Sequence, residues 1–577
     1  MASSEELVQR AVHQLEMGKF AVWLKRSLLG LIVVAIGLLY MYHFRGLATS
    51  QAMDQAQIGR AIASGHGWRT DFIRPRAIGQ LQAHGKSVPQ KIWSDTYNAP
   101  LPPLVDAIAL FPLRGHWKMT LSTFVYSGDK AIAILSISIF FASVGVLFFI
   151  ARRLFDQRLA LMTCGFVLLC DMIWQYSLSG LPQMLLLLLF NLTIYALLRA
   201  VEEKHRGGAS GLWLIAVGIG FGFLALSHAL TVWIFVAAFA CSLVFFRPRG
   251  RVAIVMLSAF AVIYLPWLLR NFMVCGNPGG VAIYSILDGL GPSEAGWMRR
   301  IPVGLQGIST GALRDKFLTN LMSQSGHLVA YFGFNVVALM FFPALLHRFK
   351  RPETDTVRWM LFFMWIGTVA GMATYGIHEE QGVAANQLHL LFIPIMTGYG
   401  LAYLLVQWRR LGIGFPIART VFVTLLYLIC AGPMIFDFLF LQSRSAVRWP
   451  PYMPPYISIL NNWMKPQEIV ASDMPWAVAW YADRASIWLP ETIKTMTDLS
   501  DYNILGGPIN GLYLTPISGA ENTYRDITKG EYRDWAPAIQ HTVVLENFPL
   551  KWATVDVGLD GECTFFSDHD REHAGFQ

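Results

Sequence analysis

Eleven long apolar runs constrain this chain more than any other feature of its sequence. Each holds about 17–23 predominantly apolar residues, enough for a helix to cross the roughly 30 Å hydrocarbon layer of a membrane. Of the 577 residues, 54% are hydrophobic and only 14% are charged, whereas soluble domains carry about 25% charged residues. We therefore predict an α-helical polytopic membrane protein of about eleven transmembrane helices. The predicted spans are 27–44, 131–151, 159–176, 182–200, 211–227, 230–246, 253–272, 328–346, 357–376, 388–406 and 419–440.

The Lys and Arg residues follow the rule that cytoplasmic segments of membrane proteins are basic. If the N-terminus is cytoplasmic, each cytoplasmic segment next to a predicted span carries a basic cluster. The clusters are Lys25-Arg26, Arg152-Arg153 with Arg158, Arg199 to Arg206, Arg247-Arg249-Arg251, Arg348 to Arg358, and Arg409-Arg410 with Arg419. Topology thus explains the formal charge of +8, and we predict no nucleic-acid partner.

Because successive connections alternate between the two sides of the membrane, the other connections are predicted to lie on the extracytoplasmic side. They are a first loop at 45–130, further loops at 273–327 and 377–387, and a tail at 441–577. Residues 1–26 are predicted to form a cytoplasmic amphipathic helix, and residues 27–440 the transmembrane module. A strand–helix–strand pattern over 468–489 predicts that the tail is a small α/β domain.

The first loop begins with a short amphipathic stretch, residues 53–63, directly after the first predicted span. Ile58 and Ile62 give this stretch an apolar stripe at helical spacing, and Gly65 is placed to end the helix. Asp54 stands near the N-terminal end. An Asp in that position either caps the helix, the commoner role of this residue type, or presents a carboxylate at the membrane boundary.

Two motifs further along the loop favour the second interpretation. The sequence Ser64-Gly65-His66-Gly67-Trp68 follows the helix, and Trp93 to Leu104, which includes Pro102-Pro103, leads into a second apolar segment at 105–113. This order of elements resembles the first periplasmic loop of the GT-C class of glycosyltransferases, which use lipid-phosphate sugars. It is most similar to the protein O-mannosyltransferase and aminoarabinose transferase families. The Pro266-Trp267 to Arg270-Asn271 element also looks like this class.

The resemblance implies a role for Asp54, the position that matches the catalytic base of the family. Such a carboxylate takes or positions the proton of the acceptor while the new bond forms. Many relatives carry Asp-Glu at this point, whereas this chain has Asp54-Gln55. The second carboxylate therefore has no counterpart here, and we predict no metal site. The resemblance further implies a polyprenyl-phosphate sugar as the co-substrate.

A lipid phosphate as leaving group calls for positive charge near the outer boundary. The candidates for binding it are Arg60, Arg74, Arg270 and His378. Arg270 is equally suited to anchor a helix at the interface, and a solvated loop charge is the simpler interpretation of Arg74. Candidates for the acceptor side are Asp95, Glu379 and Glu380, although charges in a short loop are commonly solvated.

The tail holds four tryptophans that are compatible with sugar stacking or with a small core, and we favour the core. They are Trp476, Trp480, Trp488 and Trp535.

The leading hypothesis is a membrane glycosyltransferase that moves a sugar from a polyprenyl-phosphate donor to a glycan, lipid or protein acceptor on the extracytoplasmic face of a bacterial inner membrane. An alternative is an inactive, glycosyltransferase-like subunit that binds partners in a larger membrane complex. A lipid or solute transporter would call for buried mid-span charges and symmetric halves, and the sequence offers neither.

Overall fold

The computed structural model describes most of the chain. Residues 1–18 of the predicted N-terminal helix lie outside the described part, so that prediction is not tested. The described residues are 19–47, 49–117, 119–120, 123, 125–290, 296–304, 308–412, 415–440, 454–519, 528, 532–539, 548–555 and 563–571.

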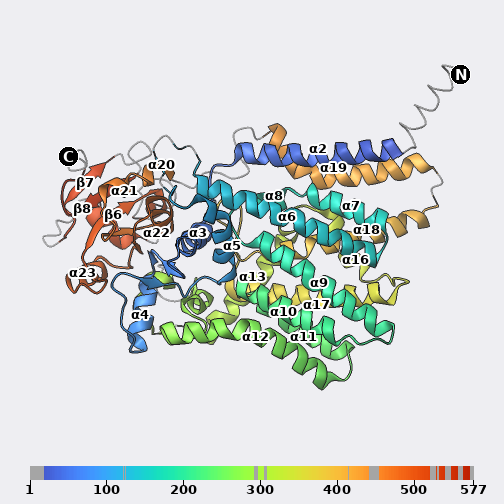
Figure 1. Cartoon of the computed structure of the whole chain (residues 1–577), viewed down its shortest axis with the longest axis horizontal. Coiled ribbons are helices and arrows are strands. Elements are labelled where there is room, and N and C mark those ends of the chain that lie inside the picture. The colour runs from blue at the N-terminus through green and yellow to red at the C-terminus, as the bar shows by residue number, and fades with distance from the viewer. Residues whose placement is uncertain are drawn as a thin grey trace, which may run out of the picture.

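A bundle of long helices makes up most of the molecule, and a mixed region of helices and strands lies at one end of it (Figure 1). The bundle contains α2 (Lys19–His43), α6 (Ser127–Leu154), α7 (Gln157–Leu168), α8 (Asp171–Leu178), α9 (Gln183–His205), α10 (Gly211–Ser227), α11 (Thr231–Phe245), α12 (Arg249–Cys275), α13 (Thr310–Gly326), α17 (Pro352–Tyr375), α18 (Ile393–Arg410) and α19 (Pro416–Phe440). Helices α2 and α19 run side by side along one edge of the bundle (Figure 1).

Within the described part of the chain, five helices are long and apolar enough to cross a membrane, namely α6, α9, α12, α17 and α19. A sixth span results if α7 and α8, which are bent by 60° at their junction, count as one. The other apolar helices, including α10 and α11, have 10–17 residues. The prediction of a helical protein with several membrane spans is confirmed, while the number eleven stays a prediction.

The segment predicted as a single span at 328–346 is broken into short helices. They are α14 (Leu328–Tyr331), α15 (Val336–Leu339) and α16 (Phe341–Ala344). Gly333 and Phe334 both adopt positive φ, a conformation that ends a right-handed helix. Asn335 then caps α15 by accepting a hydrogen bond from the Ala338 amide at 3.0 Å. The apolar composition of this segment did not reveal the break.

The mixed region combines three segments of the chain, described within 49–117, 276–304 and 454–571, and is called the outer region below. The first loop contributes α3 (Ser50–Ala63), β1 (Arg69–Thr70), β2 (Phe72–Ile73), α4 (Pro75–Ala83), β3 (Trp93–Ser94), α5 (Leu101–Leu110) and η1 (Phe111–Leu113). The second segment adds η2 (Val281–Leu287) and η3 (Trp297–Arg299). The C-terminal segment adds α20 (Pro454–Ile457), α21 (Leu460–Trp463), β4 (Ile469–Ser472), α22 (Pro475–Ala477), η5 (Val478–Ala482), β5 (Ser486–Trp488), α23 (Ile493–Asp501), β6 (Ile509–Leu514), η6 (Pro516–Gly519), η8 (Arg533–Trp535), α24 (Ala536–Ile539), β7 (Trp552–Val555) and β8 (Thr564–Ser567).

One six-stranded sheet joins the first loop to the C-terminal segment. Its strand order is β2-β5-β4-β6-β8-β7, with β2, β5, β4 and β6 parallel and β8 and β7 antiparallel. Strand β2 pairs Phe72 with Ser486 and Ile73 with Ile487. The predicted strand–helix–strand order of the tail is present as β4, α22 with η5, and β5. However, the sheet is completed by a strand from the first loop, some 400 residues earlier in the chain.

The core beneath this sheet is also shared. Ile73 and Ile78 of the first loop and Cys275 at the end of α12 belong to the same buried cluster as Leu489 and Leu512 of the C-terminal segment. Burying a large aliphatic side chain contributes about 1.5–3 kcal/mol, so each segment helps to stabilise the others. Because they fold against one another, the first loop and the tail lie at the same end of the helical bundle.

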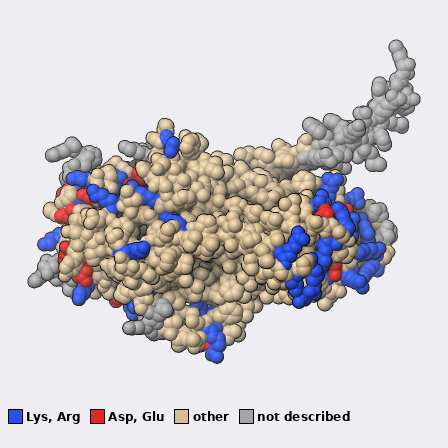
Figure 2. Space-filling view, turned by 60° about the horizontal axis from the view of Figure 1, so that its bottom comes forward, with Lys and Arg blue, Asp and Glu red and all other residues tan. Residues whose placement is uncertain are grey.

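Basic side chains gather at the opposite end of the molecule (Figure 2). They include Arg152 and Arg153 in the last turn of α6 and Arg409 and Arg410 in the last turn of α18. Between this end and the outer region, the face shown in Figure 2 carries few charges. This is the charge distribution that the predicted topology requires.

Candidate active site

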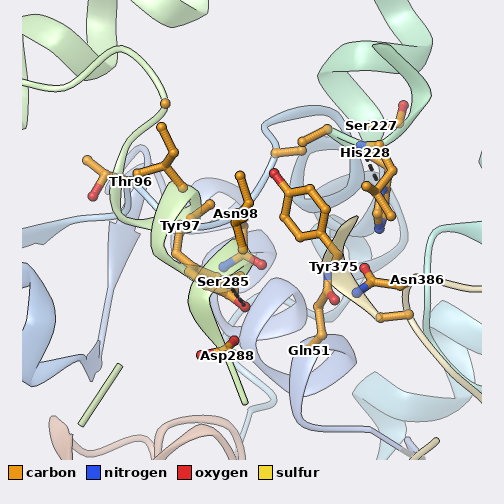
Figure 3. A pocket seen from close by; sticks show the side chains of 18 of the residues that line it. Gln51, Thr96, Tyr97, Asn98, Ser227, His228, Ser285, Asp288, Tyr375 and Asn386 are labelled. Carbon is orange, nitrogen blue, oxygen red and sulfur yellow. Dashed lines mark hydrogen bonds between the residues drawn. The ribbon is translucent and has the colours of Figure 1, made fainter. Parts of the chain in front are cut away.

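A cavity of about 560 Å³ lies where the helical bundle meets the outer region. Its bundle wall includes His228 between α10 and α11 and Tyr375 at the end of α17. Its outer wall includes Tyr97, Asn98 and Ser285. Figure 3 shows these two sets of side chains facing each other across the cavity. The lining thus combines membrane helices with segments that lie beyond them.

Helix α3 brings the predicted catalytic residue to this boundary. The helix begins at Ser50, and the hydroxyl of Thr49 caps it by accepting a hydrogen bond from the Ala52 amide at 3.2 Å. Asp54 therefore does not cap the helix, and the capping interpretation is wrong. As predicted, the chain leaves the helix just before Gly65, which has a φ of +86°, a conformation that glycine adopts readily.

Asp54 is completely buried and is held by three side chains of the first loop. Its Oδ2 accepts hydrogen bonds from Arg74 Nη2 and Asn98 Nδ2, both at 2.6 Å, and its Oδ1 accepts one from Gln57 Nε2 at 3.1 Å. Gln57 also donates to Thr70 Oγ1 at 2.8 Å. Arg74 and Asn98 line the cavity, so the carboxylate lies one hydrogen bond behind its wall. A buried carboxylate requires such a partner, because an unpaired buried charge is very costly.

Arg74 is fixed by its position in the chain. It follows β2 directly and precedes Pro75, the first residue of α4, where the restricted φ of proline suits a helix start. Its guanidinium lies over the rings of Phe72 and Tyr97, with its Cζ 4.0 Å and 3.8 Å from their centroids. Among the described residues its buried Nε has no hydrogen-bond partner. Arg74 is therefore a rigid, desolvated cation at the cavity wall.

Asp95 shapes the turn that presents Asn98. Its carboxylate accepts hydrogen bonds from the backbone amides of Tyr97 at 3.3 Å and Asn98 at 2.9 Å. Burial, followed by the negative charge of Asp54, raises the pKa of Asp95 to about 6. The structure thus brings Asp95 next to Asp54, and Asp95 is not among the residues that line the cavity.

Gln55, the neighbour of Asp54 on α3, is completely buried. Neither its Oε1 nor its Nε2 has a hydrogen-bond partner among the described residues. A buried amide in this state destabilises a protein by about 1–3 kcal/mol. In the part of the chain that the structure describes, no group of three His, Cys, Asp or Glu side chains could hold a metal ion.

Two of the arginines predicted to bind the donor do not line the cavity. Arg60 donates to the carbonyls of Ala479 at 2.7 Å and Trp480 at 2.8 Å and pairs with Asp483 at 2.7 Å, so it joins α3 to the C-terminal segment. Arg270 donates to the backbone carbonyl of Asp95. Arg74 is thus the predicted arginine that the structure places at the cavity wall.

The loop at 377–387 meets the cavity through two of its three predicted residues. His378 and Glu380 line it. Glu380 accepts hydrogen bonds from the Ser50 amide at 2.7 Å and the Ser50 hydroxyl at 2.8 Å, at the start of α3. Glu379 is exposed and is not part of the lining.

Several lining residues were missed or interpreted differently from the sequence. Trp480 and Trp535 are fully buried, as the core interpretation expects, but Trp476 and Trp488 are half-buried and line the cavity. His228 also lines it. No local pattern distinguishes these tryptophans, because their exposure depends on which end of the sheet they occupy.

Comparisons with known proteins agree with this architecture. Residues 111–269 match the sequence model of the dolichyl-phosphate-mannose-protein mannosyltransferase family. The structure is similar to that of ArnT from Cupriavidus metallidurans bound to undecaprenyl phosphate, with a TM-score of 0.55 and 13% identity over 94% of this chain and 98% of that one. The chain has a GT-C glycosyltransferase fold. No curated protein sequence matches it.

A second GT-C structure is similar over almost the whole chain. It is the oligosaccharyltransferase AglB from Archaeoglobus fulgidus in complex with an inhibitory peptide and a dolichol-phosphate, with a TM-score of 0.53 and 12% identity over 95% of this chain and 75% of that one. The resemblance predicted from the first loop is therefore confirmed at the level of fold. The family match begins at residue 111, beyond Asp54 and Arg74, so it does not address their roles.

Proposed function

We propose that this GT-C protein transfers a sugar from a polyprenyl-phosphate donor to an acceptor on the extracytoplasmic side of the membrane. The observation that carries the proposal is the buried Asp54–Arg74–Asn98 cluster at the wall of a cavity between membrane helices and the outer region. A polyprenyl tail keeps its sugar phosphate at the membrane boundary, and a cavity between apolar helices and the outer region suits a substrate held there.

The proposed reaction is a displacement at the anomeric carbon of the donor sugar. The bond from the acceptor oxygen to that carbon forms, and the bond from the carbon to the phosphate oxygen breaks. Asp54 receives the proton of the acceptor hydroxyl, and the polyprenyl phosphate leaves with the bonding electrons. Arg74 stabilises the phosphate charge as it develops. Its pairing with Asp54 at 2.6 Å must loosen on donor binding, which frees the carboxylate at the moment the acceptor is in place.

The orientation follows from charge. The basic end of the bundle faces the cytoplasm under the positive-inside rule, and the outer region, at the opposite end (Figures 1 and 2), faces away from it. A bacterial inner membrane fits this arrangement, with the sugar delivered on the periplasmic side. His378 and Glu380 complete the cavity on the side of α17 and are proposed to contact the donor and the acceptor, respectively.

The test is an Asp54→Asn variant assayed in membranes for release of polyprenyl phosphate from synthetic polyprenyl-phosphate mannose, glucose and aminoarabinose. We expect at least a hundredfold loss, because general base catalysis contributes about 10²–10⁴-fold. Asp71→Asn is the matched control, since Asp71 is an acid of the same loop that pairs with Arg69 at 3.0 Å. An Asp54→Asn variant as active as the wild type would refute the catalytic assignment.

Gln55 supports a second candidate, an inactive structural subunit of a membrane complex. Among the described residues its amide has no hydrogen-bond partner, and by the resemblance it occupies the place of a carboxylate without contributing charge. This candidate predicts copurification with partner proteins in fixed ratio and no release of polyprenyl phosphate from any of the three donors. Turnover of a donor by the purified wild-type protein would exclude it.

A further inference from the structure

Three aromatic side chains form one wall of the cavity. The ring centroids of Phe72 and Trp476 are 6.0 Å apart, those of Phe72 and Trp488 5.8 Å, and those of the two tryptophans 5.6 Å. The two tryptophan rings are perpendicular, at 90°. All three residues line the cavity, and this set is called the aromatic wall below.

The two tryptophans of the aromatic wall stand at the carboxyl ends of the adjacent parallel strands β5 and β4, and Phe72 lies on the neighbouring strand β2, paired with Ser486 at the start of β5. Phe72 lies in β2, Trp488 ends β5, and Trp476 lies in α22 directly after β4. In the strand order β2-β5-β4 these positions are neighbours. Ligands of α/β sheets bind outside the carboxyl ends of parallel strands. The topology therefore marks this edge as a binding site independently of the resemblance to GT-C proteins.

Polar atoms without partners lie beside the aromatic wall. Asn98 is 4% exposed and Arg74 is 7% exposed, both line the cavity, and neither Asn98 Oδ1 nor Arg74 Nε has a hydrogen-bond partner among the described residues. One is an acceptor and the other a donor. Because both residues line the cavity, a ligand with polar groups is favoured beside them over one that is wholly apolar.

A carbohydrate satisfies both features at once. Its ring presents C–H patches that stack on flat aromatic faces, and its hydroxyls both donate and accept hydrogen bonds. An acyl chain would cover the rings but leave Asn98 Oδ1 unpaired. The bundle wall is more apolar, with Leu230, Trp233 and Leu268, and suits the lipid part of the donor. The lipid tail of the donor and the acceptor are thus assigned to different parts of the cavity lining.

We propose that the acceptor is a carbohydrate, and that it binds on Phe72, Trp476 and Trp488 with a hydroxyl directed to Asn98, while Arg74 beside it serves the donor phosphate. The inference rests on the proposed glycosyl transfer and names the class of its acceptor. The hydroxyl that attacks the donor is then a sugar hydroxyl, and the product is a glycosidic bond within a glycan.

The experiment measures binding without the donor. Full-length protein in lipid nanodiscs is titrated against an array of neutral and amino-sugar oligosaccharides, with Ser/Thr-rich peptides as a second class of probe. We expect oligosaccharides to bind, and Trp476→Leu and Trp488→Leu each to weaken binding about tenfold. Leucine retains apolar volume but has no flat face. Trp552→Leu is the matched control, because Trp552 is 54% exposed on β7.

Three outcomes would overturn the inference. They are no oligosaccharide binding by the wild type, wild-type affinity in both leucine variants, and peptide binding that depends on the same tryptophans. Should a leucine variant fail to fold, Trp476→Phe and Trp488→Phe retain a ring, and the inference then requires them to bind more strongly than alanine variants. Release of polyprenyl phosphate is measured separately with the oligosaccharides and peptides supplied as acceptors, so that glycan binding without donor turnover refutes the proposed function, and turnover without glycan binding refutes only the assignment of the acceptor.

Discussion

Arg60 joins helix α3, which carries Asp54, to the C-terminal segment, and its removal tests how tightly the two are coupled. The guanidinium is 5% exposed and donates to the carbonyls of Ala479 and Trp480 at 2.7 and 2.8 Å. It also pairs with Asp483 at 2.7 Å, but the side chain of Asp483 is 52% exposed. The carbonyl contacts and the ion pair therefore differ in how far water competes with them.

The magnitudes follow from that difference. A hydrogen bond to a charged group contributes about 1.5–3 kcal/mol, so the loss of two buried ones in Arg60→Met should destabilise the outer region by about 3–6 kcal/mol. An ion pair with an exposed partner contributes about 0–1 kcal/mol, so Asp483→Ala should have little effect. For a unit of about 150–250 residues, 1 kcal/mol corresponds to about 2–4 °C. The expected decrease in melting temperature is thus about 6–24 °C for Arg60→Met and at most about 4 °C for Asp483→Ala.

The assay is thermal unfolding of detergent-purified protein, followed by tryptophan fluorescence and by limited proteolysis of the C-terminal segment. We expect the C-terminal segment of Arg60→Met to become protease-sensitive at temperatures where the helical bundle is still folded. Equal effects of the two variants would refute the reasoning, because the ion pair would then account for the coupling. A variant that unfolds like the wild type but no longer turns over the donor would instead support the donor-binding role predicted for Arg60 from the sequence.

Three further predictions concern the walls of the cavity. Gly280→Ala should destabilise the protein by more than about 1 kcal/mol and deform the cavity, because Gly280 has a φ of +63° and an added Cβ would lie 2.0 Å from the Thr96 carbonyl oxygen. Thermal unfolding measures the loss of stability, and a variant as stable as the wild type would contradict this prediction. The pKa of Asp95 is raised to about 6 in the folded protein, so the folded state binds the proton of this carboxyl more tightly than the unfolded state. The resulting contribution to stability is full below about pH 4 and should be lost as the pH rises to about 6. Asp95→Asn should flatten this part of the stability–pH curve, and an unchanged curve would exclude Asp95 as its source. Gln55→Leu should leave stability unchanged or raise it by about 1 kcal/mol, since it removes a buried amide that has no partner among the described residues. A large loss of stability in the same unfolding assay would mean that the amide has a partner in the membrane.

Helical periodicity and charge predicted the features that depend on local sequence. The apolar runs gave the positions of α6, α9, α12, α17 and α19, because length and hydropathy are sufficient for a span. They did not reveal the break near Gly333, where two consecutive residues with positive φ interrupt an otherwise apolar segment.

Long-range pairing limited the prediction of the site. Asp54 was identified from its position after the first span, and Arg74 from its charge. Their contact at 2.6 Å depends on how the chain folds back over the twenty residues that separate them. Asn98 was not singled out, because its role arises only where the turn shaped by Asp95 brings it to the same carboxylate. Strand β2 has two residues, too few for an alternating pattern, and so the sequence suggested a separate C-terminal domain.

This short strand decides how donor and acceptor groups are positioned relative to each other. Phe72 lies in β2 and Arg74 follows it immediately, while β2 pairs in parallel with the strand that ends at Trp488. The charge proposed to bind the phosphate and the rings proposed to bind the acceptor are therefore carried on neighbouring strands of one sheet. Strand spacing in a sheet is fixed at about 4.8 Å by hydrogen bonds, so the distance between the two groups cannot vary as it would between a hinged lid and a membrane domain. We therefore expect any opening that admits the acceptor to occur between the sheet and the helices of the bundle wall, rather than within the sheet.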